Sequence, residues 1–84
     1  MSNDVLTKVR EIFEELFEVD PHSVSLETKA YDIPAWDSVG HLSLCGVLEE
    51  SFEIRFDVSD LGEVNSVRAI VAMVESKKGL LVEA

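Results

Sequence analysis

One serine of this chain stands where its hydroxyl could take part in chemistry. Ser38 follows Asp37 in the stretch Trp36-Asp37-Ser38-Val39. Aspartate is a strong N-cap residue, because its carboxylate accepts the free backbone N–H groups of a first helical turn. Ser38 would then lie at the start of a helix over residues 38–52, beside the positive end of the helix dipole. Phosphate groups bind favourably at such a position, so a phosphate group would be held favourably beside Ser38.

The helix predicted for residues 38–52 carries apolar residues on two faces. At about 3.6 residues per turn, the side expected to face the core holds His41, Leu44, Cys45, Leu48 and Phe52. Another side holds Val39, Leu42, Gly46, Glu49 and Glu53, so it is apolar near the serine and acidic farther along. An apolar patch outside the core stripe indicates a docking surface. The alternative is that Val39 and Leu42 merely contact the preceding loop.

The residues around Ser38 also resemble those of the acyl carrier proteins. The resemblance rests on Asp37-Ser38-Val39, followed by Leu42, Leu44, Leu48, Glu49, Glu50, Phe52 and Ile54, and it continues through residues 54–56 and 64–70. In that family the serine of an Asp-Ser-(Leu/Val) motif is esterified by 4′-phosphopantetheine from coenzyme A. The terminal thiol of this arm carries an acyl group as a thioester.

The resemblance implies roles for individual residues and partners. Ser38 would be the attachment site, with Asp37 as the helix cap beside it. The partners would be a phosphopantetheinyl transferase and acyl-loading and acyl-processing enzymes with basic docking surfaces. The surface facing them would comprise Val39, Leu42, Gly46, Glu49, Glu50 and Glu53.

Composition limits the remaining possibilities. The 84 residues predict a single domain over 1–84, and 17 acidic against 7 basic residues give a net charge of −10. This balance argues against binding nucleic acid through phosphate neutralisation and favours basic protein partners. With neither a signal segment nor a membrane-spanning apolar run, we expect a cytoplasmic monomer that does not enter a membrane. The single cysteine cannot form an internal disulfide, which agrees with a reducing compartment.

The hydrophobic pattern predicts an all-α fold. Apolar residues from Val5 to Phe17 recur at helical spacing, with Ser2, Asn3 or Asp4 as cap and Asp20-Pro21 as the stop. Residues 20–36 form a long loop in which Val24 and Leu26 are expected to point inward. Tyr31, Ile33 and Trp36 should make an apolar patch ahead of Ser38. Trp36 would cover the end of the bundle or, alternatively, help to shape where an arm or a partner lies.

The rest of the chain predicts two further helices. Ile54 and Phe56 should return the chain to the core, and a short helix over 57–61 should end at Gly62. The last helix should start near 65–66, bury Val67, Ile70, Val71 and Val74, and end near Lys77, Lys78 and Gly79, with residues 80–84 frayed. The predicted architecture is a small four-helix bundle of three main helices and one short helix, of the acyl carrier protein type, with a long loop between its first two helices.

Other chemistry is poorly supported. Ser38 and His41 could hydrogen-bond, but a hydrolase also needs a preceding strand and an oxyanion hole. A calcium loop starting at Asp57 fails because Leu61 and Arg68 occupy ligand positions. Cys45 is expected to be a small buried residue, and two isolated histidines predict no zinc site. The sequence therefore predicts a carrier with no catalytic residues and no metal.

Two other functions stay open, as does the pathway. A peptidyl or aminoacyl carrier would share the fold, serine and arm, and Trp36 departs from the commonest fatty-acid carriers. A helical interaction domain would never carry an arm. Gly40, Ser43 and Gly46 fall where many fatty-acid carriers have acidic or larger residues. This difference favours a dedicated pathway, such as specialised lipid, polyketide or polysaccharide modification, over bulk fatty-acid synthesis.

Overall fold

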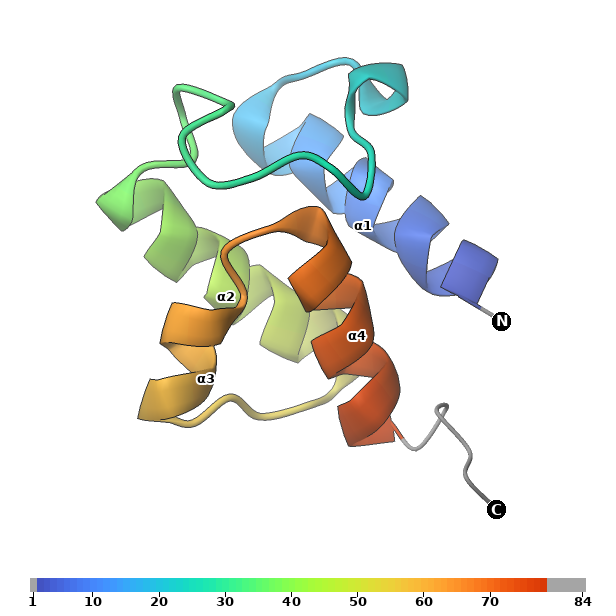
Figure 1. The fold of residues 1–84 in the computed structure, drawn as a ribbon, viewed down its shortest axis with the longest axis vertical. Coiled ribbons are helices and arrows are strands. Elements are labelled where there is room, and N and C mark those ends of the chain that lie inside the picture. Colours follow the sequence, from blue (N-terminus) through green and yellow to red (C-terminus); the bar gives the residue numbers. More distant parts are fainter. Residues whose placement is uncertain (1, 79–84) are drawn as a thin grey trace.

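Four α-helices and one short 3₁₀ turn make up the part of the chain that the structure describes (Figure 1). The structure is a computed structural model that describes the backbone of residues 2–78 and the side chains of residues 5–78. In chain order the elements are α1 (Ser2–Phe17), η1 (Pro21–Ser23), α2 (Ser38–Phe52), α3 (Val58–Glu63) and α4 (Val67–Lys78). Within residues 2–78 the only β pairing is two isolated bridges, Lys29–Ser66 and Ala30–Ile33. The prediction of an all-α bundle with three main helices and one short helix is confirmed.

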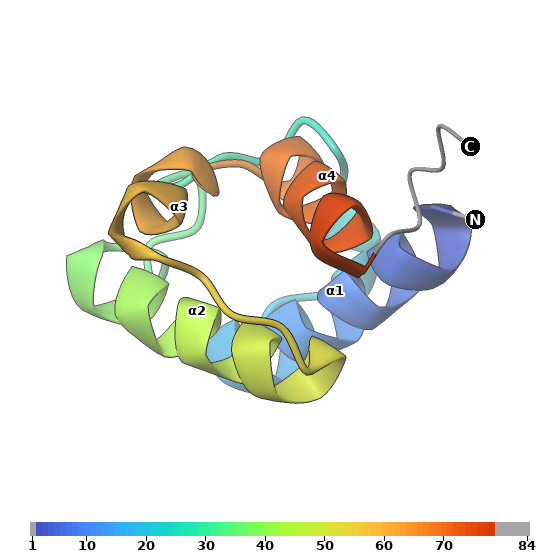
Figure 2. The same cartoon turned by 90° about the horizontal axis from the view of Figure 1, so that it is seen from below.

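Helix α1 packs against both α2 and α4, and α3 lies on the opposite side of the bundle from α1 (Figure 2). The predicted apolar stripe of α1 faces this core. Its buried members are Val5, Val9, Ile12, Phe13 and Phe17, with Leu6 and Leu16 half-buried. The helical spacing of these residues is therefore explained by packing alone.

Both ends of α1 differ from the prediction. Ser2, Asn3 and Asp4 lie within the helix, so none of them precedes it as the predicted cap. The helix ends at Phe17, before Asp20-Pro21, because Glu18 adopts the left-handed conformation (φ 57°). The Glu18 N–H still donates to the Glu14 carbonyl at 2.9 Å. A left-handed residue at this position is a common way to end a helix, so the proline is not what stops it.

The long segment between α1 and α2 is fixed against α1 at one point. Val24 is fully buried and Leu26 is half-buried, as predicted. The Arg10 side chain of α1 donates from Nε to the Val24 carbonyl at 2.8 Å. The loop therefore crosses the bundle under both apolar and hydrogen-bonded restraint.

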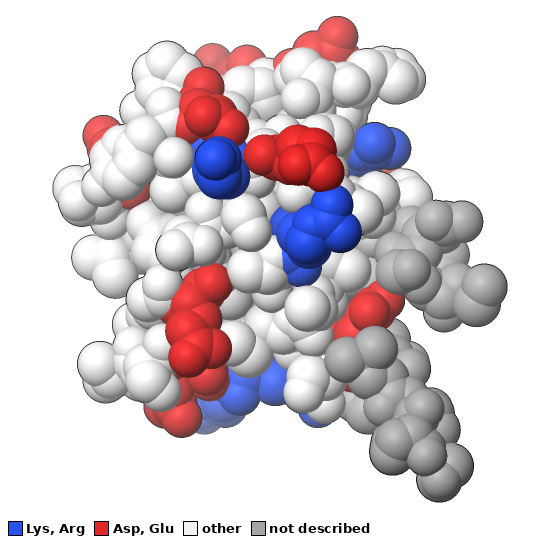
Figure 3. Space-filling model, in the orientation of Figure 1, with Lys and Arg blue, Asp and Glu red and all other residues white. Residues whose placement is uncertain are grey.

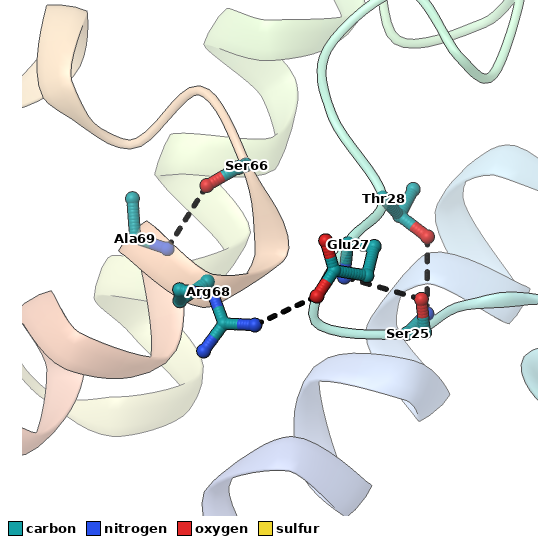
Figure 4. A network of polar contacts seen from close by, with 6 residues as sticks. All are labelled: Ser25, Glu27, Thr28, Ser66, Arg68 and Ala69. Atoms are coloured by element: carbon teal, nitrogen blue, oxygen red, sulfur yellow. Dashed lines mark hydrogen bonds and ion pairs between the residues drawn. The ribbon is translucent and has the colours of Figure 1, made fainter.

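The same segment is fixed to the start of α4. The Val67 N–H donates to the Thr28 carbonyl at 2.8 Å, and Arg68 pairs with Glu27 at 2.8 Å. Figure 4 shows this ion pair beside the Ser25–Thr28 hydrogen bond within the loop. Because two helices hold the loop, its last residues reach the start of α2 in a defined position.

The predicted apolar patch of Tyr31, Ile33 and Trp36 does not form, because two of the three side chains are buried. Ile33 is 8% exposed and Trp36 is completely buried, whereas Tyr31 is 69% exposed. Trp36 packs edge-on against Phe13, with ring centroids 5.1 Å apart, and stacks on Phe17 at 6.3 Å. Burying the largest apolar ring of the loop closes this end of the core, and the tyrosine is left outside it.

The connection from α2 to α3 returns to the core through Ile54, which is buried, and Phe56, which is half-buried. The Glu49 carboxylate accepts the Phe56 N–H at 2.8 Å. Asp57 caps helix α3, as predicted, so the helix starts at Val58, but it does not end at Gly62. It runs to Glu63 because the chain leaves the helix only at Val64, which is fully buried and whose N–H donates to the Asp60 carbonyl.

Helix α4 agrees with the prediction over its described length. Ser66 Oγ accepts the Ala69 N–H at 3.1 Å and so caps the helix (Figure 4). The predicted face is buried (Val67, Ile70, Val71 and Val74), and Lys77 and Lys78 form its basic last turn. Gly79 and the tail at 80–84, predicted to fray, lie outside the described residues.

Candidate functional site

Ser38 is the first residue of α2, and its side chain is exposed. Asp37 is the N-cap: its Oδ1 accepts the Gly40 N–H at 2.9 Å, and its carbonyl accepts the His41 N–H at 2.7 Å. The first N–H groups of a helix have no acceptor within the helix. Since Asp37 serves Gly40, the N–H groups of Ser38 and Val39 remain directed toward the outer end of α2.

A surface hollow of about 410 Å³ adjoins Ser38. The loop contributes Ala30 and Tyr31 to its wall, α2 contributes Ser38, His41 and Leu42, and the opposite side is formed by Leu61, Gly62 and Asn65. The Tyr31 hydroxyl lies 3.5 Å from Ser38 Oγ. The structure thus places an apolar-walled space with a few polar groups beside the candidate hydroxyl, which is the general character of a ligand site.

Gly40 determines how closely the loop approaches α2. A Cβ at this position would lie 1.9 Å from the Ala35 carbonyl oxygen and 3.2 Å from the Phe17 ring. The glycine is therefore required by packing, and the sequence-based interpretation of Gly40 as part of a less bulky docking face needs correction. The sequence held one signal of this packing requirement: a glycine stands in the first turn of the predicted helix, although glycine is intrinsically unfavourable in helices. By contrast, nothing lies within 4 Å of a Cβ at Gly46.

His41 connects the loop to α3 and leaves Ser38 without a basic partner. The Trp36 indole N–H donates to His41 Nδ1 at 2.8 Å, and His41 Nε2 lies 2.8 Å from the Leu61 carbonyl oxygen. Because the indole can only donate, Nδ1 must be unprotonated and Nε2 carries the proton given to Leu61. Both ring nitrogens are thus committed, and the Ser38–His41 hydrogen bond needed by a hydrolase does not form.

The two faces of α2 are arranged as the sequence predicts. Leu44, Cys45 and Leu48 are buried, whereas Val39 is 74% and Leu42 63% exposed. Figure 3 shows acidic side chains over α3 and, at the left of the view, a mostly white surface around the start of α2 with a few acidic side chains at its edge.

The acidic residues of the predicted partner-binding surface differ in their exposure and hydrogen bonding. Glu50 and Glu53 are exposed, but Glu49 is half-buried and already accepts the Phe56 N–H. Glu53 ends α2 in the left-handed conformation, with φ 56°. Gly46 is exposed on the same helix.

Cys45 is unsuited to thiol chemistry. It is 3% exposed, and burial together with the charge of Glu49 raises the pKa of its thiol to about 11. The thiolate, which is the nucleophile, is therefore scarce at neutral pH.

Two further features concern the described residues as a whole. Among residues 2–78, no group of three or more His, Cys, Asp or Glu side chains is placed to hold a metal ion. None of the helices described here has the length and apolar character needed to cross a bilayer.

Comparisons with known proteins agree on one family. Residues 7–74 match the family model described as "Phosphopantetheine attachment site". The chain is 32% identical over 76 residues to an acyl carrier protein of Thermotoga maritima, covering 90% of this chain and 94% of the relative. It is 32% identical over 71 residues to an acyl carrier protein of Campylobacter concisus, covering 84% and 92%.

A solved structure shows the same likeness in three dimensions. The solution structure of a holo acyl carrier protein from Geobacter metallireducens superposes with a TM-score of 0.79 at 32% identity. The match covers 93% of this chain and 90% of that protein.

Proposed function

Because the chain belongs to the phosphopantetheine attachment-site family of acyl carrier proteins, we propose that Ser38 carries its 4′-phosphopantetheine arm. The observation that carries the proposal is the placement of Ser38: it is exposed, it is the first residue of a helix capped by Asp37, and it adjoins the hollow. Free N–H groups and the helix dipole favour a phosphodiester at this position. The cofactor itself supplies a terminal thiol that holds an acyl group as a thioester.

Attachment is a group transfer from coenzyme A. The Ser38 oxygen forms a bond to the phosphorus that carries pantetheine, and the pyrophosphate bond to the adenosine part breaks. The adenosine bisphosphate leaves, and the Ser38 proton passes to a base of the transferase. His41 cannot act as that base, since both its ring nitrogens are already hydrogen-bonded. The chain itself is a carrier rather than an enzyme.

Cys45 does not compete with the arm for cargo. It is the only cysteine of the chain, it is buried, and the raised pKa of its thiol keeps it protonated. An acyl group found on the protein would therefore be held by the arm. A free, unpaired cysteine also fits a reducing compartment, and we propose that the carrier acts as a monomer in the cytoplasm.

Partner enzymes are proposed to dock on the outer face of α2 near Ser38. Val39 and Leu42 supply exposed apolar contacts, and Glu50 and Glu53 supply negative charge farther along the helix. Lys or Arg residues around a partner's active-site entrance would complement this charge and speed encounter in a salt-dependent manner. Once docked, the cargo is held at high effective concentration.

We further propose a dedicated pathway, such as specialised lipid, polyketide or polysaccharide modification, rather than bulk fatty-acid synthesis. The support comes from Ser43 and Gly46, which are both exposed and leave this part of α2 small and uncharged. Gly40 does not support the dedicated pathway, because packing against the loop explains why this residue is glycine. Trp36 gives no support for a peptidyl cargo either, since it is a core residue.

The attachment proposal is tested by intact mass. Incubation with coenzyme A and a broad-specificity transferase is expected to add one phosphopantetheinyl group to the wild type and none to Ser38→Ala. Ser43→Ala is the matched control, because it removes another exposed serine of the same helix and should leave modification complete. A wild type that several transferases leave unmodified would contradict the proposal and favour an interaction domain without an arm.

The pathway proposal is tested separately with the loaded carrier. A housekeeping fatty-acid ketosynthase is expected to turn over this carrier far more slowly than its own. Ser43→Glu combined with Gly46→Met should partly restore turnover, and both sites have room for the larger side chains. If the ketosynthase turned over this wild-type carrier as fast as its own carrier, the case for a dedicated role would be removed.

A further inference from the structure

Tyr31 occupies a position that packing does not explain. Its backbone is left-handed (φ 74°), which is unfavourable for an aromatic residue, yet its side chain is 69% exposed and adds little to the core. The surrounding loop holds it there: the Tyr31 N–H donates to the Trp36 carbonyl at 3.1 Å. An unfavourable conformation that the fold maintains without a packing reward suggests a functional role.

The Tyr31 hydroxyl is directed at the attachment position. It lies 3.5 Å from Ser38 Oγ, whereas a strong O–H···O bond spans about 2.7–2.8 Å. The two hydroxyls are thus neighbours without a strong mutual bond, and the tyrosine proton is available to another acceptor. The non-bridging oxygens of a phosphodiester on Ser38 are two bonds from Oγ, so they would be formed next to this donor.

The other charged or ionisable side chains around Ser38 are not placed to donate a hydrogen bond to a phosphodiester there. No lysine or arginine is among the residues that line the hollow. His41 uses both ring nitrogens for Trp36 and Leu61. Asp37, which adjoins Ser38, is an acceptor already engaged as the cap. Asn65 also lines the hollow and has an amide N–H₂ group, but Tyr31 is the donor whose polar atom lies against Ser38 Oγ, at 3.5 Å. Hydrogen bonds to an anionic acceptor are stronger than those between neutral groups.

We propose that Tyr31 is a positioning residue for the arm: its hydroxyl donates to a non-bridging phosphodiester oxygen on Ser38. This inference rests on the proposed attachment at Ser38. Tyr31 also forms part of the wall of the hollow, so the bond fixes the base of the arm against that hollow. The arm thereby leaves the protein in a restricted direction.

Spectroscopy of the holo protein tests the proposal without any partner enzyme. Tyr31 is the only tyrosine of the chain, so tyrosine labelled with ¹³C at the hydroxyl-bearing ring carbon gives one assigned resonance. That resonance is expected to shift when the apo protein is converted to the holo form. The ³¹P resonance of the arm should differ between the holo wild type and holo Tyr31→Phe. Phenylalanine keeps the ring and the backbone, so the difference reports the hydroxyl alone.

The controls separate this inference from the attachment proposal. Val58→Ala changes a side chain that is 85% exposed at the start of α3 and should leave the ³¹P resonance of the arm unchanged. A ³¹P resonance identical in wild type and Tyr31→Phe, with a tyrosine resonance unaffected by the arm, would overturn the role of Tyr31 while Ser38 stays modified. An intact mass showing no arm on Ser38 would instead overturn both proposals.

Discussion

The starts of α2 and α3 use the same local device. Asp37 accepts the Gly40 N–H at 2.9 Å, and Asp57 accepts the Asp60 N–H at 3.0 Å. Each aspartate has extended backbone geometry and precedes an exposed residue, Ser38 in α2 and Val58 in α3. Judged by the cap alone, the two helix starts are equivalent.

They differ in the third residue of the helix. In α3 this residue is Asp60, whose carboxylate accepts the Asp57 N–H at 3.1 Å and pairs with Lys77 at 2.9 Å. The two carboxylates at the start of α3 would repel a phosphate group. In α2 the third residue is Gly40, and the Ala35 carbonyl occupies the space that a side chain would take.

The neighbours of the two starts differ as well. The loop places Tyr31 and the hollow next to Ser38, whereas α3 makes its own capping box. An aspartate cap is thus sufficient to start a helix, whereas the groups that surround Ser38 come from the segments packed around it.

The largest expected effect is a complete loss of modification that a serine at α3 cannot restore. Val58→Ser in a Ser38→Ala background recreates the Asp-Ser sequence at the start of α3, and Val58 is exposed enough to be replaced. We expect no arm by intact mass after incubation with transferase and coenzyme A, because the loop and the hollow are not there. The Val58→Ser variant that keeps Ser38 should carry one arm, attached to Ser38. An arm on the double variant would mean that the capped serine is sufficient.

A smaller effect is expected on stability from the glycines of the two helices. Gly40→Ala would place a Cβ 1.9 Å from the Ala35 carbonyl oxygen, so the loop must shift. Overpacking of this kind typically costs about 1–3 kcal/mol in the free energy of unfolding. Gly62→Ala in α3 meets nothing within 4 Å and should gain up to about 1 kcal/mol from helix propensity.

Urea unfolding measures both changes, and Gly46→Ala is the control within α2, since nothing lies within 4 Å of its Cβ either. Trp36 is the only tryptophan, so its fluorescence also reports a shift of the loop. A Gly40→Ala protein as stable as Gly46→Ala would show that the close approach of loop and helix is not required.

The smallest expected effect is on how the stability contributed by the Asp60–Lys77 pair, at the start of α3, depends on pH. The hydrogen bond from Lys77 lowers the pKa of the Asp60 carboxyl below its ordinary 3.8 and raises the pKa of Lys77 above 10.5. A carboxyl with a lowered pKa contributes stability that is fully present above its ordinary pKa and is lost as the pH falls through the folded value. For Lys77 the contribution is present below its ordinary pKa and is lost as the pH rises through the raised one.

Comparison of wild type with Asp60→Asn tests this dependence, because asparagine can keep the acceptor of the capping box. Urea unfolding as a function of pH should show a stability difference that shrinks at the acidic end and again at the strongly alkaline end. A difference that stays constant across both ranges would mean that the Asp60–Lys77 pair contributes no pH-dependent stability.

The sequence by itself determined the features that depend on neighbouring residues. The spacing of apolar residues predicted the core faces of α1, α2 and α4, because a helix must bury one stripe against its neighbours. Asp37 and Asp57 predicted where α2 and α3 begin, since a cap bonds within its own first turn. The Asp-Ser-Val motif pointed to the family, and the comparisons confirmed it.

Only the tertiary structure decided the features that join distant segments. Helix α1 ends at Phe17 because Glu18 is left-handed. Ile33 and Trp36 are buried, and Gly40 is required because the Ala35 carbonyl and the Phe17 ring lie where a side chain would be. The nearness of Tyr31 to Ser38 depends on a left-handed residue whose conformation no local pattern indicates. Local rules fix the conformation of a few neighbouring residues, whereas the position of a long loop depends on contacts made far along the chain, which is why the surroundings of Ser38 could not be derived from its motif.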